Sequence, residues 1–144
     1  MKLIKILIGT LMMILLGSSI SLAGDFEWAK NFDIKARLDP SGFKASLGTR
    51  FKIGNTEIEA VIGNVQNPSD AYMVFRLGEM SGRSPDYVVE KYKSEKGKGW
   101  GVIAKSLGIK PGSAEFHALK RNHDLYDTKP QTKSKGKGKG KGKK

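Results

Sequence analysis

The chain has 144 residues, a formal net charge of +12 and no cysteine. This length provides for one modest domain, and the lack of cysteine excludes a disulfide framework, a thiol nucleophile and a cysteine-based metal site. Stability must therefore come from a hydrophobic core, which a domain of roughly 100 residues can form with only a small margin.

Residues 1–23 are typical of a secretory signal peptide. Two lysines stand near the start, residues 6–16 form a nearly continuous apolar run, and Ser21 and Ala23 are small residues at the positions that signal peptidase requires. The apolar run is shorter than the about 20 residues of a membrane-spanning helix, which favours cleavage after Ala23 over an uncleaved anchor. We therefore expect export through the secretory pathway, to the periplasm or the extracellular space.

Residues 24–38 form an N-terminal arm for which the sequence leaves two structures open. Phe26, Trp28 and Phe32 fit one side of a short helix. Apolar residues also occur at every second position, as in a short strand: Phe32, Ile34, Ala36 and Leu38. We interpret the arm as a short strand or extended segment that packs its aromatic side chains on the rest of the domain.

Residues 39–128 carry repeated helix signals and predict a small, mainly α domain, a bundle of five or six short helices. Asp39 and Ser84 each precede a proline, which is the pattern of an N-cap followed by proline at the first helical position. Thr56 and Glu59 match a capping box at the start of another helix. Apolar residues at helical spacing predict the buried faces: Phe43, Leu47, Phe51, Met73, Val74, Leu77, Tyr87, Val88 and Tyr92.

The segment WGVIAKSLGIKPGSAEFHALKR, residues 100–121, predicts two short helices around a turn. Gly108 is the turn glycine, Ile109 is the apolar residue that pins the turn, and Ser113 is the N-cap of the second helix. The inward side chains are expected to be Trp100, Ile103, Ala104, Leu107, Phe116 and Leu119. A glycine turn between two amphipathic helices is the pattern of a helix-turn-helix.

This segment is similar to the helix-turn-helix of sigma-factor-type and resolvase-type DNA-binding domains. By that resemblance, the outward residues of the second helix would read base edges: Glu115, His117, Lys120 and Arg121. Recognition helices usually begin with residues such as Arg, Asn, Gln or Ser, whereas Glu115 near the start of this helix would repel phosphate. The export signal also separates the chain from chromosomal DNA. We therefore interpret the segment as a packing unit rather than a reader of DNA sequence.

The longer run RLGEMSGRSPDYVVEKYKSEKGKGWGVIAKSLGIKPGSAEFHALK, residues 76–120, resembles a family of small exported bacterial proteins without an assigned activity. The resemblance covers about the middle third of the chain. It implies a helical fold and export, and it implies no reaction.

Patterns for cofactors and catalysis are weak in this sequence. Residues 97–104 superficially fit a GxGxxA dinucleotide fingerprint, but that motif must follow a buried strand, and here it follows a charged helical segment. His117 and His123 have a spacing that matches no familiar zinc pattern. A nucleophile, a base and oxyanion donors cannot be assembled from the sequence. We expect no cofactor, no metal and no enzymatic activity.

Positive charge is concentrated in two segments. Residues 91–121 contain eight basic residues and two acids, a net charge of +6, whereas residues 24–90 contain eight basic residues and ten acids, a net charge of −2. Residues 129–144 contain eight lysines and no acid, and this composition predicts a disordered tail because it has no apolar residue to bury and its charges repel. The expected anion-binding residues are Lys91, Lys93, Lys96, Lys98, Lys105, Lys110, Lys120, Arg121, Lys133, Lys135, Lys137, Lys139, Lys141, Lys143 and Lys144.

These features favour an exported protein that binds an anionic envelope component or another polyanion non-specifically, through a basic helical face and the Lys/Gly tail. Tyr92 and Trp100 lie among the lysines, a combination that suits polyanion binding. The expected partners are lipid headgroups, lipopolysaccharide or extracellular nucleic acid. One alternative is a nucleic-acid-binding module that uses the helix-turn-helix-like unit. Another is that the basic face is merely solvated and the tail merely keeps the protein soluble.

Overall fold

The computed structural model describes residues 26–126, which form seven α-helices and no strand. The helices are α2 (Trp28–Leu38), α3 (Pro40–Phe51), α4 (Asn55–Ile62), α5 (Pro68–Ser81), α6 (Pro85–Ser94), α7 (Trp100–Ser106) and α8 (Ala114–Arg121). The mainly α fold is therefore confirmed, and six of the helices lie after residue 39, as the sequence predicts. The predicted signal peptide and the Lys/Gly tail lie outside the described residues.

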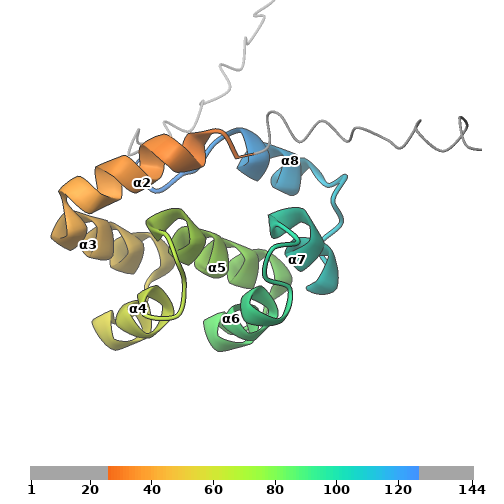
Figure 1. Cartoon of the computed structure of the whole chain (residues 1–144), viewed down its shortest axis with the longest axis horizontal. Helices are drawn as coiled ribbons and strands as arrows, with labels where there is room; N and C mark the ends of the chain where they lie inside the picture. Colours follow the sequence, from red (N-terminus) through yellow and green to blue (C-terminus); the bar gives the residue numbers. More distant parts are fainter. Residues whose placement is uncertain (1–25, 127–144) are drawn as a thin grey trace, which may run out of the picture.

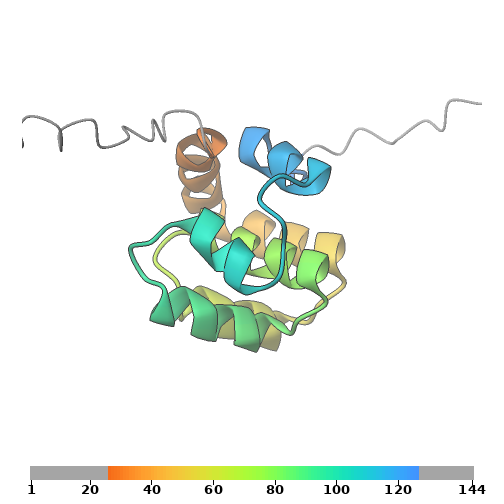
Figure 2. The same ribbon diagram turned by 90° about the vertical axis from the view of Figure 1, so that its right-hand side faces the viewer.

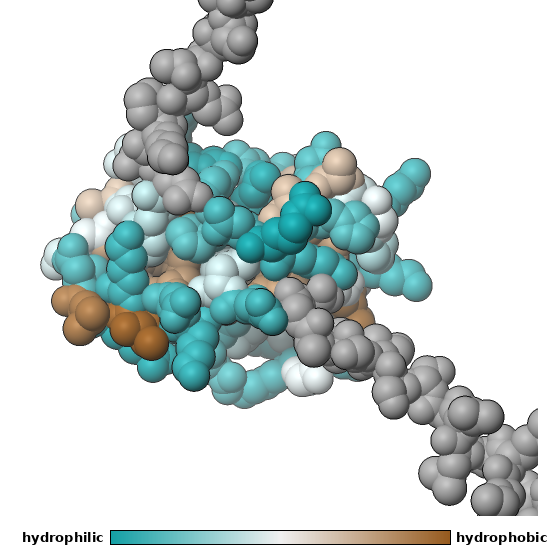
Figure 3. Space-filling model, turned by 90° about the horizontal axis from the view of Figure 1, so that it is seen from above, coloured by the Kyte–Doolittle hydropathy of each residue, from teal (hydrophilic) through white to brown (hydrophobic). Residues whose placement is uncertain are grey.

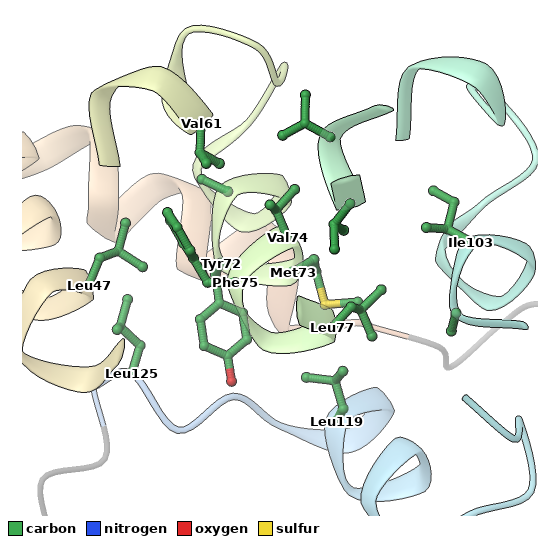
Figure 4. Packing of buried hydrophobic residues seen from close by; sticks show 14 of the residues in the cluster. Leu47, Val61, Tyr72, Met73, Val74, Phe75, Leu77, Ile103, Leu119 and Leu125 are labelled. Atoms are coloured by element: carbon green, nitrogen blue, oxygen red, sulfur yellow. The ribbon is translucent and has the colours of Figure 1, made fainter. Parts of the chain in front are cut away.

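The helices are stacked in three layers around α5 (Figures 1 and 2). Helices α2 and α8 form one outer layer, α3, α5 and α7 form the middle layer, and α4 and α6 form the other outer layer. Helix α5 contributes more buried residues than any other described helix and packs against α2, α4 and α6. Figure 4 shows how Tyr72, Met73 and Leu77 of α5 extend into the core shared with the surrounding helices.

Local sequence signals explain where α5 begins and ends. Asn67 and Asp70 form a capping box, in which each side chain accepts a hydrogen bond from the other residue's backbone N–H. Pro68 occupies the first helical position. Gly82 ends the helix in a left-handed conformation, with φ of 67°, which glycine adopts without steric strain. This central helix is thus fixed at both ends.

The capping box predicted at Thr56 is wrong. Helix α4 begins at Asn55, and its N-cap is Gly54, which has no side chain to accept a hydrogen bond. Thr56 therefore lies inside the first turn. A threonine three residues before a glutamate also occurs inside helices. The spacing therefore marks a helix start only when the residue before the threonine is not helical, and here that residue, Asn55, already is.

The N-terminal arm is a helix from Trp28 onward, not the short strand or extended segment expected from the sequence. Phe32 and Ala36, four residues apart, are buried in the core, whereas Ile34 and Leu38 are 53% and 82% exposed. The apolar residues at every second position therefore belong to two different faces of one helix, a buried face and an exposed face. The ring centroids of Trp28 and Phe32 lie 5.5 Å and 5.4 Å from that of Tyr72 on α5, so these aromatic residues of the arm pack on the domain as expected.

The outer layer of α2 and α8 joins the two ends of the described chain. The backbone N–H of Phe26 donates to the Lys120 carbonyl at 3.0 Å, and the indole Nε1 of Trp28 donates to the Leu119 carbonyl at 2.8 Å. Viewed onto this layer, the surface is mostly hydrophilic, with a small hydrophobic patch at one edge (Figure 3). These two hydrogen bonds hold the start of the described chain against α8, near its end.

Candidate functional site

The eight basic residues predicted from residues 91–121 lie on α6, α7, α8 and the connections between these helices. These helices all lie on one side of the molecule, the right-hand side of Figure 1, which faces the viewer in Figure 2; we call it the basic side. All eight residues are exposed or partly exposed: Lys91, Lys93, Lys96, Lys98, Lys105, Lys110, Lys120 and Arg121. The seven lysines predicted from the tail lie outside the described residues.

Several of these cations make weak surface contacts. Lys98 forms an ion pair of 3.1 Å with Glu95, and the Lys93 ammonium donates to the side chain of Asn64. The ammonium groups of Lys91 and Lys120 lie over aromatic rings, 5.7 Å and 5.4 Å from the ring centroids. Exposed contacts of these kinds contribute about 0–1 kcal/mol each. An anionic ligand can therefore compete with them for the lysines.

A stacked pair of aromatic rings lies within the basic side. The rings of Tyr92, on α6, and Trp100, at the start of α7, are 5.3 Å apart with an interplanar angle of 24°. The connecting loop turns back through Gly97 and Gly99, which both have φ of +86°, a left-handed conformation that favours glycine. These glycines bring Trp100 back onto α6. Both aromatic side chains are half-buried, so Trp100 is a boundary residue rather than the fully inward residue expected from the sequence.

The carboxylate of Asp70, in the first turn of α5, holds both rings in place. Its Oδ1 accepts a hydrogen bond from Trp100 Nε1 at 3.2 Å, and its Oδ2 accepts one from the Tyr92 hydroxyl at 3.1 Å. The backbone N–H of Asn67 also donates to Oδ2, at 3.1 Å. Burial and the negative charge of Asp70 raise the pKa of Tyr92, which therefore stays neutral and remains a donor at physiological pH.

An open pocket of about 270 Å³ lies beside this stacked pair, and we call it the Asp70 pocket. Its polar and aromatic lining comes from three regions of the chain: Gln66, Asn67, Asp70, Tyr92, Lys96 and Trp100. The sequence indicated the aromatic residues among lysines but not Asp70. In the sequence, Asp70 follows Asn67 and Pro68, a pattern typical of a helix start, which signals a helix terminus rather than a site.

A second pocket, of about 520 Å³, lies between the end of α5 and the connection from α7 to α8. Two of its charged residues are basic, Arg76 and Lys110, and two are acidic, Glu79 and Glu115. Arg76 forms an ion pair with Glu79. Because the charges balance, this pocket has no preference for anions, although it includes the predicted anion-binding residue Lys110.

The predicted helix, turn and helix of residues 100–121 are all present. Ile109, Phe116 and Leu119 are buried as expected, and the Ser113 hydroxyl accepts a hydrogen bond from the N–H of Phe116 as the N-cap of α8. The connection, residues 107–113, is longer than the three- or four-residue turn of a DNA-binding helix-turn-helix. Glu115 lies in the first turn of α8 and is exposed. The unit therefore has the order of elements of the motif but not its tight turn.

The described residues contain no group of three or more side chains arranged to hold a metal ion. His117 is exposed on α8, and His123 packs against aromatic rings, with its centroid 4.8 Å from that of Phe32. No helix between residues 26 and 126 combines the length and apolar character needed to cross a membrane.

A network of ion pairs and hydrogen bonds holds the segment after α8 against the rest of the domain. The sequence did not predict this network. Arg50 of α3 donates two hydrogen bonds of 3.1 Å to the carboxylate of Glu79, and its Nη2 donates to Asp124 Oδ2 at 2.7 Å. The buried Tyr72 hydroxyl donates to Asp124 Oδ1 at 2.7 Å. This network joins α3 and α5 to the segment after α8.

The network changes the acidity of its members. Hydrogen bonds from Arg50 lower the pKa of Glu79 below its ordinary range. Burial favours the neutral form of Asp124, but hydrogen bonds from Arg50 and Tyr72 outweigh it and lower the pKa of that carboxyl. The hydrogen bond to Glu79 contributes most to raising the pKa of Arg50. Each carboxylate is therefore held in its charged form, in which it accepts the hydrogen bonds that join α3 and α5 to the segment after α8.

Comparison of the chain with protein-family models, with curated proteins and with solved structures found no match. Functional inference therefore depends on the residues and their geometry.

Proposed function

We propose that this protein is exported and non-enzymatic, and that it binds an anionic polymer or membrane surface through its basic side and its Lys/Gly tail. One observation carries the proposal. All eight basic residues between positions 91 and 121 are exposed or partly exposed, and the helices that bear them lie on one side of the molecule. The same segment has only two acids, and one of them, Glu95, pairs with Lys98. This imbalance favours anions as ligands.

The tail adds a second set of cations. It contains eight lysines in residues 129–144, and a lysine close to an anionic membrane contributes about 1 kcal/mol. On a polymer, the corresponding gain comes from the release of counterions, which weakens as salt concentration rises and does not depend on sequence. The proposed binding is therefore sensitive to salt and tolerant of different polyanions.

A nucleic-acid-binding module is the second candidate, supported by the order of α7, turn and α8. The long connection and the exposed Glu115 count against it, because a glutamate in the first turn of α8 would repel the phosphates that a recognition helix must approach. Specific recognition of one duplex would nevertheless favour this candidate over the first.

The tail can be tested by replacing all eight of its lysines with glutamine, which preserves its length and removes its charge. We expect the affinity of the chain from Gly24 to Lys144 for vesicles rich in anionic lipid to fall at least about tenfold, because several contacts of about 1 kcal/mol each are lost. Vesicle co-sedimentation over a salt titration measures the effect, and uncharged vesicles serve as the control.

Two results would contradict the proposal. Unchanged binding by the glutamine variant would remove the tail from the mechanism. If one duplex sequence outcompetes random duplex at physiological salt, then binding is sequence-specific, and the helix-turn-helix-like unit is the functional element instead.

A further inference from the structure

We infer that the Asp70 pocket binds one sugar ring of an acidic polysaccharide. This inference rests on the proposed function, because it names the class of anionic polymer that the basic side recognises. It adds a defined subsite to a surface that otherwise attracts anions only through its charge.

The first support is the rigidity of the aromatic pair. Tyr92 and Trp100 stack on each other, and their polar edges are both bonded to the carboxylate of Asp70. Asp70 is itself fixed by the backbone N–H of Asn67 in the capping box of α5. A binding surface whose side chains are already held in place loses little entropy when a ligand arrives. The apolar faces of aromatic rings offer contact area to the C–H face of a sugar.

The second support is the size and composition of the pocket. Its volume of about 270 Å³ is slightly below the range of about 300–1,000 Å³ for pockets that enclose drug-sized ligands. It therefore suits a single ring of a larger polymer. Asn67 and Gln66 add amide or backbone groups to the aromatic lining, and this combination of apolar contact with a few polar groups fits a ring that bears several hydroxyls.

The third support is the hydrogen-bonding capacity of Asp70. Within the described part of the chain, Oδ2 accepts from the Asn67 backbone, the Asn67 side chain and the Tyr92 hydroxyl, whereas Oδ1 accepts only from Trp100. Because each carboxylate oxygen has two lone pairs, Oδ1 can accept one further donor. A sugar hydroxyl is such a donor.

The fourth support is the position of the lysines. Lys96 lines the pocket, and Lys98 follows it in the same loop. An acidic sugar can therefore place its ring beside the aromatic pair and its carboxylate beside Lys96. Lys105 and Lys110, which are exposed on the same side of the molecule, add positive charge for neighbouring units of the same polymer.

The test uses the chain from Gly24 to Lys144 and a trisaccharide of galacturonic acid as the probe. The protein contains two tryptophans, and each provides one indole N–H signal in an NMR spectrum. Trp28 is bonded to the Leu119 carbonyl between α2 and α8, so its signal is an internal control. We expect the Trp100 signal to shift and saturate on titration while the Trp28 signal stays in place.

Two exposed residues of the pocket allow substitution without disturbing the core. Gln66→Ala and Lys96→Gln are each expected to weaken binding of the trisaccharide about threefold to tenfold, whereas Lys52→Gln, an exposed lysine at the end of α3 and outside the basic side, leaves it unchanged. If Lys52→Gln weakened binding as much as Lys96→Gln while Gln66→Ala had no effect, the attraction would be one of diffuse charge and the subsite would be overturned.

The outcomes separate this inference from the proposed function. If the chain binds anionic polymer but the trisaccharide leaves the Trp100 signal unmoved, the subsite is wrong and the proposed function stands. If neutral maltotriose shifted the Trp100 signal equally, the inference that the ligand is acidic would be overturned. If oligothymidylate shifted it more, the pocket would be assigned to single-stranded nucleic acid instead.

Discussion

Replacing Phe32 with alanine is expected to lower the free energy of unfolding by about 3–5 kcal/mol. Phe32 lies on α2 and is only 2% exposed. Its ring centroid is 5.4 Å from that of Tyr72 and 5.8 Å from that of Phe43, so truncation would leave a cavity where three helices meet. Because domains of this size have a total stability of about 5–15 kcal/mol, the variant would be close to unfolding at ambient temperature.

Urea unfolding followed by circular dichroism measures this effect, and Leu38→Ala provides a matched control. Leu38 is on the same helix but 82% exposed, so its truncation should change stability by less than about 0.5 kcal/mol. If Phe32→Ala were as stable as Leu38→Ala, then α2 would be an arm attached to the domain rather than part of its folding unit.

The fold was largely predictable because most of its signals are local. The starts of α3, α6 and α8 are marked by side chains that accept from a nearby backbone N–H: Asp39, Ser84 and Ser113. The arm was ambiguous for a physical reason. Apolar residues occupy both the buried and the exposed face of α2. Their spacing in the sequence therefore fits the two-residue repeat of a strand as well as the 3.6-residue repeat of a helix.

The candidate site was only partly predictable. Composition was sufficient to locate the lysines and the two aromatic residues among them. Asp70, however, is 22 residues from Tyr92 and 30 from Trp100, and no periodicity connects positions at such separations. The same holds for Arg50 and Asp124, which are 74 residues apart. Contacts of this kind depend on how the helices are stacked, which only the three-dimensional arrangement provides.

Replacing Arg50 with methionine is expected to lower the free energy of unfolding by about 2 kcal/mol at pH 7 and to weaken its dependence on pH. Hydrogen bonds to charged groups contribute about 1.5–3 kcal/mol. Arg50 serves two carboxylates, but the side chains of Glu79 and Asp124 are each 44% exposed, so solvent screening reduces the total. Methionine retains much of the apolar stem of the arginine, but it loses the guanidinium, whose carbon lies 4.7 Å from the centroid of the Phe51 ring.

The direction of the pH effect follows from the lowered pKa values of Glu79 and Asp124. Unfolded carboxyls titrate at about pH 4. A carboxyl with a lower pKa in the folded state therefore adds stability above that pH, and this stability is lost as the pH falls through the folded pKa. The stabilities of the original chain and of Arg50→Met should differ most near pH 7 and converge toward pH 2.

Urea unfolding at a series of pH values between about 7 and 2 tests this convergence. Glu90→Gln is a suitable control, because Glu90 is exposed on α6 and its loss should leave the pH profile nearly unchanged. A constant difference between Arg50→Met and the original chain at every pH would mean that Arg50 stabilises the fold through an interaction that does not depend on the two carboxylates, such as the contact of its guanidinium with the Phe51 ring. Such a result would contradict the interpretation that ion pairs of Arg50 hold the segment after α8 in place.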